Sequence, residues 1–448
     1  MTDSAAQIRS ELDHLKQVVA DLLAEAKHQG ASAAEAGVSA DRGLDLTVRL
    51  GEVETVEHTS DHGLGVTVYF GQRKGSASTT DLSPAAVKET VAAACRIAKY
   101  TSEDPCAGLA DAARMAYDYP DLDLFHPWDI DAIAAADIAR ACEEAARSAD
   151  PRISNSEGAT VSTQGGSFVY GNSHGFVGGY PVSRHSISCS VLAGEGDAMQ
   201  RDYWYTSSRL PGELDAPELV GRRAAERTVA RLNGRRLETR KVPVIFRAEL
   251  APGLVRSFLG AIRGHAIYRK ASFLLDQVGE QLFPAWMQMS EDPLRPRGLA
   301  SAPFDNEGVA TTPRNLLVDG VLQGYVLDSY AARKLGLETT GNAGGVRNVS
   351  VSQSDMDLDM LLRAMGTGLL VTELMGQGVN SVTGDYSRGA AGFWVENGQI
   401  QYPVEEITVA GNLKDVFRNL VAVGNDNQIP GSINTGSWLV EQMTVAGD

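Results

Sequence analysis

The chain has 448 residues, of which 43% are hydrophobic and 22% are charged, and its formal net charge is −17. A chain of this length exceeds one ordinary core, so we expect a soluble globular protein with two or three domains. The acidic balance argues against a general nucleic-acid surface or an anionic-membrane surface, since both require clustered Lys and Arg.

The first predicted domain covers residues 1–110 and has a helix near each end. Apolar residues recur at helical spacing over residues 8–26, and Gly30 follows as a stop signal. A second helix is predicted over residues 84–100, because Ser83 is a suitable N-cap and a proline occupies the first turn. Between the helices, segments of alternating polarity predict an antiparallel sheet with one face covered. These segments are residues 43–50, 64–70 and 73–80, and a turn at Gly71-Gln72 joins the last two.

The middle region, residues 111–235, starts with a polar linker over residues 111–123. An alanine-rich helix is predicted over residues 129–148, and another over residues 216–232 has arginines at its C-terminal end. Between these helices, the pattern predicts a β-meander over residues 159–164, 167–170, 176–180 and 186–192. This region either stands alone or packs with the first domain as one unit.

The third predicted domain, residues 236–448, opens with a strand over residues 241–246 and a helix over residues 251–263. Beyond them the chain is a succession of short strands and glycine-rich turns, including a hairpin around Asp319-Gly320. No repeat of about 20–50 residues is present, which disfavours solenoids and propellers. The predicted fold class is therefore α+β, with an N-terminal α/β region that has an antiparallel sheet and flanking helices, followed by a C-terminal β-rich domain with short helices.

Residues 383–417 are the part of the chain with the most unusual local features. Residues 383–389 are a polar loop bracketed by glycines, and glycine permits the close backbone approach that ligand-binding loops need. Asn397-Gly398 follows between two strand-like runs, and this pair is typical of a type I′ hairpin turn. A short amphipathic helix is predicted over residues 413–420. On local physics alone, this stretch is a surface hairpin followed by a core helix.

Three other patterns suggest chemistry but have simpler structural interpretations. Residues 171–175 match the G-x-S-x-G pattern of a serine nucleophile, yet glycines and a proline follow where that motif needs a helix, so we expect a β-turn. Residues 355–359 resemble a calcium loop, but Met360 replaces its glycine, which favours the acidic first turn of a helix. A strand would direct the adjacent carboxylates of Glu405 and Glu406 to opposite faces, which disfavours a paired acid–base role.

Five further blocks of sequence lie in order between about residue 151 and the C-terminus, and they carry the same resemblance as residues 383–417. They are residues 171–175, 268–276, 298–305, 329–337 and 365–378. In these blocks the sequence resembles the TldD/PmbA family, also called TldD/TldE or modulators of DNA gyrase, and specifically its PmbA (TldE) branch.

The resemblance implies a two-subunit cytosolic protease in which the TldD chain holds a catalytic Zn²⁺ through a His-Glu-x-x-x-His helix and a late cysteine. Such a site activates water on the metal. This chain has no His-Glu pair, His265 is its only histidine after His185, and no cysteine follows Cys189. We therefore expect no cofactor in this chain and Zn²⁺ in a TldD-type partner subunit. The pair is associated with cleaving unfolded or extended peptides.

The glycine-bracketed loop and the hairpin are our candidates for contact with the partner or the substrate. We expect them to close the cavity over the partner's zinc, to line the route to it and to stabilise the partner. An edge strand there would accept an extended peptide by β-addition. We expect no catalytic or metal-binding residue in this chain, and the candidates are Arg269, Thr383, Asp385, Tyr386, Arg388, Phe393, Trp394 and Glu396.

Two other functions are compatible with the sequence. The chain alone would be a metallopeptidase if other residues bound zinc or if it formed an active homodimer. Alternatively, it would be a regulatory protein that binds DNA gyrase, as the older family name suggests. Each function predicts a different partner, since a peptidase needs only metal and a regulator needs gyrase.

The location of the protein is predicted from what the sequence lacks. No uninterrupted apolar run approaches the roughly 20 residues that span a bilayer. The start shows no basic segment followed by an apolar one, which argues against a signal peptide. The four cysteines are widely spaced, without a Cys-x-x-Cys pair. We therefore expect free thiols, a cytoplasmic protein, and neither nucleic acid nor membrane as a partner.

Overall fold

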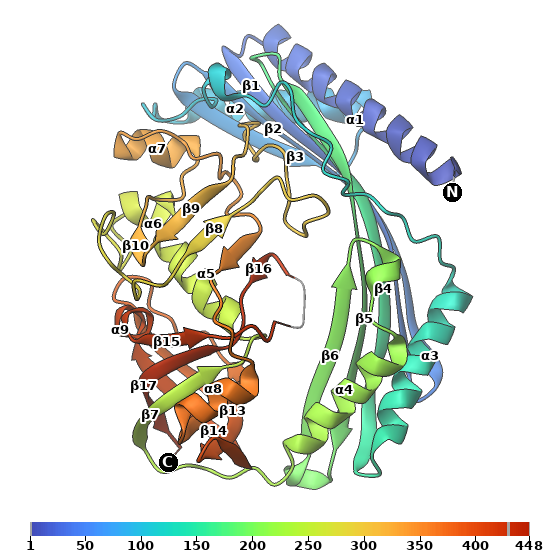
Figure 1. The fold of residues 1–448 in the computed structure, drawn as a ribbon. Helices are drawn as coiled ribbons and strands as arrows, with labels where there is room; N and C mark the ends of the chain where they lie inside the picture. Colours follow the sequence, from blue (N-terminus) through green and yellow to red (C-terminus); the bar gives the residue numbers. More distant parts are fainter. Residues whose placement is uncertain (1, 428–430, 448) are drawn as a thin grey trace.

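The computed structural model describes residues 2–427 and 431–447 (Figure 1). Within these ranges the strands form three sheets, and the first is a long curved wall with the order β3-β2-β1-β4-β5-β6. Its neighbouring strands are all antiparallel, as predicted. The strands are β1 (Ala33–Arg49), β2 (Glu52–Phe70), β3 (Arg73–Thr79), β4 (Ile153–Asn172), β5 (Val177–Ala193) and β6 (Gln200–Ser208). Because β1 pairs with β4, the first and middle regions share one sheet.

Helices cover the convex face of this wall (Figure 1). Helices α1 (Thr2–His28) and α2 (Pro84–Tyr100) pack on one end, and α3 (Ala132–Ala149) and α4 (Pro217–Ala230) pack on the other. Ser83 caps α2 as predicted, since its Oγ accepts a hydrogen bond from the N–H of Ala86 at 3.3 Å. Short 3-10 helices are η1 (Ala112–Arg114), η2 (Gly196–Ala198) and η3 (Pro211–Glu213).

The strands of the wall are longer than the sequence predicts. Strand β1 begins at Ala33 rather than at residue 43, because small buried residues alternate with polar ones beneath α1 and α2. Alanine has a low strand propensity, so this alternation was missed. Strand β4 runs without a break through Gly165 and Gly166, where two strands were predicted. A β-carbon at Gly166 would lie 2.2 Å from Asp41 Oδ1 of β1, so this glycine makes room for a neighbour and marks no turn.

The C-terminal half contains the other two sheets and a set of short helices. The second sheet has the order β14-β13-β12-β7-β17-β15, and an additional pairing of β14 with β17 bends it back on itself. Its strands are β7 (Arg240–Phe246), β12 (Gly368–Met375), β13 (Asp385–Glu396), β14 (Gln399–Asn412), β15 (Leu420–Val423) and β17 (Trp438–Ala446). The third sheet, β10-β9-β8-β11-β16, consists of β8 (Met289–Glu291), β9 (Arg314–Val318), β10 (Val321–Leu322), β11 (Val349–Val351) and β16 (Ile433–Asn434). The helices are α5 (Ala251–Ala261), α6 (Gly264–Tyr268), α7 (Ser329–Leu335), α8 (Leu358–Met365) and α9 (Leu413–Arg418).

The turns that the sequence predicts are present. Asn397 and Gly398 have φ angles of 52° and 74°, so both central positions have the positive φ of a type I′ turn. Asp319 and Gly320 repeat this pattern with 51° and 75°. Residues 171–175 form the predicted β-turn, which joins β4 to β5. Asp357 caps α8 through a 2.8 Å bond from the N–H of Met360, which confirms the acidic first turn.

The C-terminal half lies against the concave side of the wall (Figure 1). A charged network joins the two halves at the end of the wall near α4. Arg227 of α4 lies 3.4 Å from Asp202 of β6 and 3.2 Å from Glu249, which precedes α5. Arg231, one turn further along, contacts Glu373 of β12. These groups are mostly shielded from water, so removal of one of them would leave its partner charge unpaired. The contact between the two halves would then be weaker.

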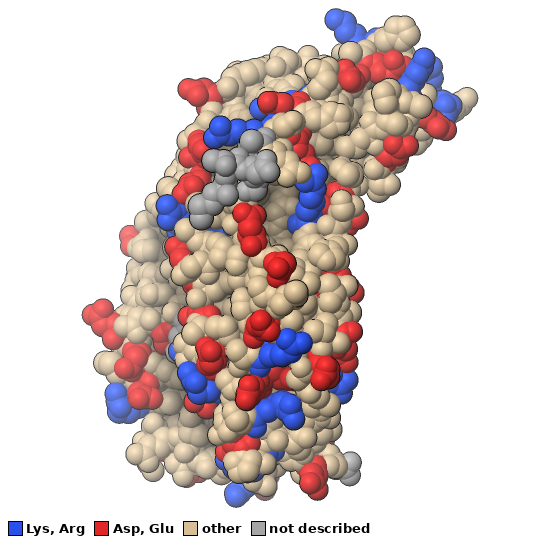
Figure 2. Space-filling view, turned by 90° about the vertical axis from the view of Figure 1, so that its right-hand side faces the viewer, with Lys and Arg blue, Asp and Glu red and all other residues tan. Residues whose placement is uncertain are grey.

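All four cysteines lie within the described ranges and are free thiols, as predicted. Across the same ranges, no helix is both long and apolar enough to cross a membrane. Figure 2 shows acidic and basic side chains interspersed over the face that it presents.

Candidate functional site

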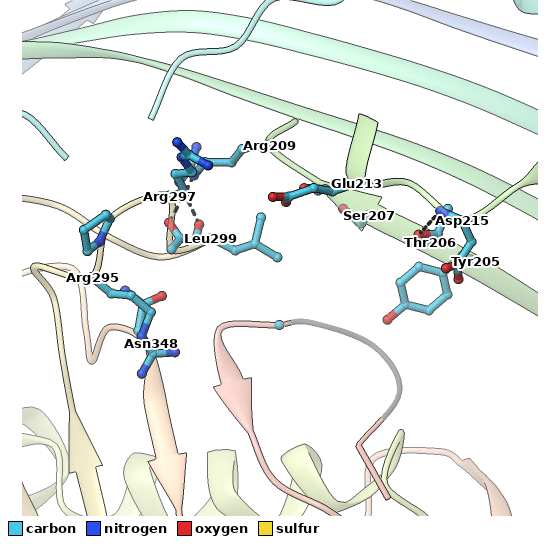
Figure 3. Close-up of a pocket in the computed structure, with 14 residues that line it drawn as sticks. Tyr205, Thr206, Ser207, Arg209, Glu213, Asp215, Arg295, Arg297, Leu299 and Asn348 are labelled. Carbon is cyan, nitrogen blue, oxygen red and sulfur yellow. Dashed lines mark hydrogen bonds between the residues drawn. The ribbon is translucent and has the colours of Figure 1, made fainter. Parts of the chain in front are cut away.

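The two halves of the chain enclose a cavity of about 360 Å³ between the C-terminal end of β6 and the loop that follows β8. Figure 3 shows Arg209 and Glu213 approaching it from the wall, and Arg295, Arg297 and Asn348 approaching it from the C-terminal half. We call it the interdomain cavity. Its lining residues are Tyr205, Thr206, Ser207, Ser208, Arg209, Glu213, Asp215, Arg295, Pro296, Arg297, Gly298, Leu299, Asn348 and Gly431.

Arg209 is the structural centre of this cavity. Its side chain is only 6% exposed, and burial lowers the pKa of its guanidinium. The nitrogens donate to backbone carbonyls on three separate segments of the chain. The acceptors are Gly298 O, Leu299 O and Ser183 O at 3.0 Å, and Leu124 O at 3.4 Å. Arg209 therefore ties the wall to the C-terminal half, and four of its five N–H groups donate to the protein itself.

Three other charged groups of the interdomain cavity, Arg295, Arg297 and Glu213, also have partners. Arg297 Nε lies 2.6 Å from Asp123 Oδ2, and this hydrogen bond lowers the pKa of Asp123. Arg295 donates to Ser350 Oγ at 3.0 Å, and Glu213 accepts from Ser208 Oγ at 2.8 Å. The lining thus carries both positively and negatively charged side chains, and neither sign dominates. Such a surface suits uncharged polar groups, including peptide amides, better than one strong ion.

Strand β6 brings an open sheet edge to the interdomain cavity. In the described part of the chain β6 pairs with β5 on one side and with no strand on the other. The N–H of Tyr203 donates to Asp202 Oδ1 at 2.7 Å, so it points away from β5. Alternate residues of an antiparallel strand share this direction, so the N–H groups of Tyr205 and Ser207 also point outward. Both residues line the cavity, which therefore offers backbone hydrogen bonds to an extended chain.

The prediction of a loop over residues 383–389 is wrong for most of its length, because β13 begins at Asp385 and pairs with β14 from there. The turn that precedes β13 is held by hydrogen bonds. Thr383 Oγ1 donates to Asp385 Oδ2 at 2.6 Å, and Asn412 Nδ2 donates to Asp385 Oδ1 at 3.0 Å. These bonds lower the pKa of Asp385. Asn412 also caps α9, since its Oδ1 accepts from the N–H of Lys414 at 3.1 Å. Both candidates are exposed, so they are available to a partner, and their role stays a prediction.

Tyr386 and Arg388 point from β13 towards the interior. Tyr386 is 3% exposed, its ring lies edge-on to Phe246, and burial raises the pKa of its hydroxyl to about 12. Among the described residues, neither the Tyr386 hydroxyl nor Arg388 Nε has a hydrogen-bond partner within the protein. Tyr386 is therefore part of the core and does not project from the loop.

The remaining candidates lie apart from this loop. Trp394 is buried, its indole donates to Glu396 Oε1 at 2.8 Å, and Phe393 packs beside α8. Asp385 and Glu396 are at opposite ends of β13, roughly 35 Å apart at about 3.3 Å per residue. Arg269 is exposed and lies over the Tyr268 ring at 5.6 Å. The structure thus does not gather the predicted residues into one site, and none of them lines the interdomain cavity.

The residues that would have to bind zinc do not fit a metal site. Helix α5 turns Leu254, Val255 and Phe258 into the hydrophobic core. In the late tail, the Asp426 carboxylate accepts hydrogen bonds from the N–H and Oγ of Ser437 at 2.8 and 2.6 Å. Across residues 2–427 and 431–447, no three His, Cys, Asp or Glu side chains are grouped so that they could hold an ion. We therefore derive no metal-dependent step from this chain.

Comparisons with known proteins cover the whole chain. Three family models, described as PmbA/TldA metallopeptidase domain 1, central domain and C-terminal domain, match residues 34–98, 125–232 and 239–447. The chain is 51% identical to Metalloprotease PmbA of Escherichia coli O157:H7, over 99% of this chain and 98% of that protein. It is 50% identical to the Metalloprotease PmbA homolog of Haemophilus influenzae, over 100% and 99%.

More distant relatives include a second type of chain. Haemophilus influenzae also has a Metalloprotease TldD homolog, which is 23% identical over 56% of this chain and 55% of its own. A solved structure from Bacteroides thetaiotaomicron, described as a modulator of DNA gyrase, has a TM-score of 0.92 and 28% identity over 97% of this chain and 99% of that one. TldE from Thermococcus kodakarensis has the same fold, with a TM-score of 0.80 and 21% identity over 96% of this chain and 100% of that one.

Proposed function

The chain belongs to the PmbA/TldA metallopeptidase family, and from this premise we propose that it is the PmbA (TldE)-type subunit of a heteromeric zinc peptidase. Its partner is a TldD-type chain, which carries the Zn²⁺ and cleaves unfolded or extended peptides in the cytoplasm. This chain shapes the space that the peptide occupies and supports the partner, without contributing a metal ligand.

The single observation behind this proposal is the composition of α5 and of the late tail. Metal-dependent peptide cleavage needs imidazole, thiolate or carboxylate ligands around an ion with an open position. The described part of the chain groups no such ligands, and α5 uses Phe258 and Leu254 as core residues. His265, the only histidine of the C-terminal half, faces Asp328 at 3.3 Å from Nδ1 to Oδ2.

A heteromeric assembly is supported by Haemophilus influenzae, which has both a PmbA homolog and a TldD homolog. The two chains differ strongly in their identity to this protein, 50% against 23%, so one organism maintains two types of subunit. Such a division suits an enzyme in which one type provides the metal and the other provides shape.

The interdomain cavity supports a peptide as the ligand of the assembly. The β6 edge offers N–H and C=O groups without side-chain specificity, as an enzyme that cleaves many unfolded sequences would need. Tyr203 and Tyr205 stack at 6.3 Å between ring centroids and add apolar surface beside this edge.

A second candidate function is a peptidase that acts without a partner. It is favoured by the relative that is 51% identical, because that protein is itself named a metalloprotease. A third, binding to DNA gyrase, is favoured by the description of the Bacteroides structure. Both act through this chain alone, which separates them from the subunit proposal.

Zinc content and peptidase activity test these functions together. We would purify this chain, the TldD-type chain of the same organism and their mixture, and measure bound zinc and cleavage of reduced β-casein. The proposal predicts a metal-free, inactive chain and an active mixture with zinc. Stoichiometric zinc and cleavage by this chain alone would establish the self-sufficient peptidase. Co-sedimentation with gyrase, together with an inactive mixture, would establish the regulatory function.

A further inference from the structure

We propose that residues 52–63 of β2 are a docking strand for the TldD-type subunit, so that a strand of the partner extends the first sheet. This inference rests on the proposed function. Strand β2 pairs with β1 over its whole length, but with β3 only from Leu64 to Phe70. In the described part of the chain no strand pairs with the outer side of residues 52–63, which we call the free edge.

The free edge is exposed on both faces of the sheet. Residues 52–58 are all exposed, whereas alternate residues from Leu64 onwards are buried. Val53 and Val56 are 40% and 44% exposed, although they pair with Val48 and Leu46, which are buried. An added strand would satisfy the free N–H and C=O groups and would cover these valines.

The free edge is held in a fixed shape before any partner binds. Glu143 of α3 is buried, and its carboxylate accepts the N–H groups of Leu50 and Gly51, each at 2.8 Å. Arg140 Nε donates to Gly51 O at 3.1 Å. Both turn residues have positive φ, 53° and 84°. The β1–β2 turn is therefore fastened to α3, so little conformational freedom is lost when a strand docks.

The charge of the free edge selects the occupant. It contains Glu52, Glu54, Glu57 and Asp61 and neither Lys nor Arg. Arg49 of β1 pairs with Glu54 at 3.2 Å, and the free edge stays acidic through the other three carboxylates. A second copy would bring the same four carboxylates to the contact in any register, with no Lys or Arg on its strand to pair with them, and like charges directly opposite are destabilising. The occupant is therefore a different chain whose docking strand presents Lys or Arg.

The length of the free edge also favours a functional contact with another chain. At about 3.3 Å per residue it extends over roughly 36 Å, enough for a whole strand of a partner. Proteins commonly protect unwanted edges with proline, with charged side chains or by keeping them short. The acidic residues of the free edge protect it against its own copies and leave it open to a basic strand. The free edge has no proline and is long.

The test compares charge reversal at the free edge with the same change elsewhere. The edge variant is Glu57→Lys with Asp61→Lys. The control is Glu89→Lys with Asp118→Lys, which alters two exposed acidic residues away from the free edge by the same total charge. Binding of each to the TldD-type subunit is measured by sedimentation, after circular dichroism has confirmed folding. We expect the edge variant to bind at least about tenfold more weakly and the control to stay within about twofold.

Hydrogen exchange of the wild-type chain gives a second measurement that needs no variant. Addition of the TldD-type subunit should slow exchange at alternate amides of residues 52–63. A stable complex with unchanged affinity in the edge variant and no protection at these amides would overturn the docking strand and leave the proposed function intact. Absence of any complex would overturn both. Protection in a homodimer of this chain alone would identify a second copy as the occupant and overturn our assignment.

Discussion

Replacement of Arg209 tests how the two halves of the chain are joined around the interdomain cavity. Arg209→Met keeps a long apolar stem but removes the guanidinium hydrogen bonds to Gly298 O, Leu299 O, Ser183 O and Leu124 O. Gly298 O and Leu124 O each keep a backbone donor, the N–H groups of Ser301 and Ser183. Each buried carbonyl left without a donor costs about 1–3 kcal/mol, and removal of a buried charge recovers part of that cost. The longest of the bonds, at 3.4 Å, contributes least. Most of the cost therefore comes from Leu299 O and Ser183 O, and we expect a net loss of about 2–4 kcal/mol.

Thermal unfolding is the appropriate assay, because a chain with more than one domain need not unfold in a single step. A loss of this size should lower the melting temperature by roughly 5–10 °C. Arg184→Met is the matched control, since Arg184 is exposed nearby and donates to Ser207 Oγ at 3.0 Å. It should shift the melting temperature by less than about 2 °C. Equal melting temperatures for the two variants would refute the structural role assigned to Arg209.

Three further variants test other parts of the account. Glu143→Ala removes the acceptor for the N–H groups of Leu50 and Gly51. Native-state hydrogen exchange at these two amides should therefore accelerate at least roughly tenfold. Unchanged exchange rates would argue against the anchored turn. Gly398→Val places a β-carbon at positive φ and 2.8 Å from Arg363 Cα. Thermal unfolding should therefore show that the free energy of unfolding falls by at least about 2 kcal/mol. A wild-type melting temperature would contradict this expectation. Burial raises the pKa of Glu307 from its ordinary 4.5 to about 7, so the folded state favours the protonated carboxyl and loses up to roughly 3 kcal/mol as pH rises through this window. The difference in melting temperature between Glu307→Gln and wild type should therefore be more favourable to the variant at pH 8 than at pH 5. If this difference is the same at both pH values, Glu307 does not titrate in this window.

Local signals in the sequence predicted the structure well where one or two residues determine the backbone. Ser83 with the following proline located the start of α2, and Asn397-Gly398 located the turn between β13 and β14. The first half of β1 was missed because alanines at alternate positions are a weak signal for a strand. Gly166 was assigned to a break between two strands. The side chain that requires a glycine at this position belongs to Asp41 of the neighbouring strand, which lies far away in the sequence.

The interdomain cavity could not be predicted, because its lining comes from segments that only the fold brings together. Arg209 follows a strand, and Gly298 lies in a loop of the C-terminal half, with no shared motif between them. Tyr386 was assigned to a surface loop because glycine and polar residues surround it. Its burial follows from the inward-facing position that β13 gives it, which the residue pattern of the loop does not reveal. That α5 carries no His-Glu-x-x-x-His motif can be read directly from the sequence, because a ligand motif is a local feature.

The central claim is that peptide cleavage uses zinc held by the partner and none held by this chain. The most direct measurement is β-casein cleavage by two matched heteromers, one with the first motif histidine of the TldD-type subunit replaced by alanine and one with His265→Ala in this chain. We expect the partner variant to assemble but to lose zinc and cleavage, whereas the heteromer with His265→Ala should retain both. Cleavage that survives in the partner variant, or zinc that disappears with His265, would contradict the account.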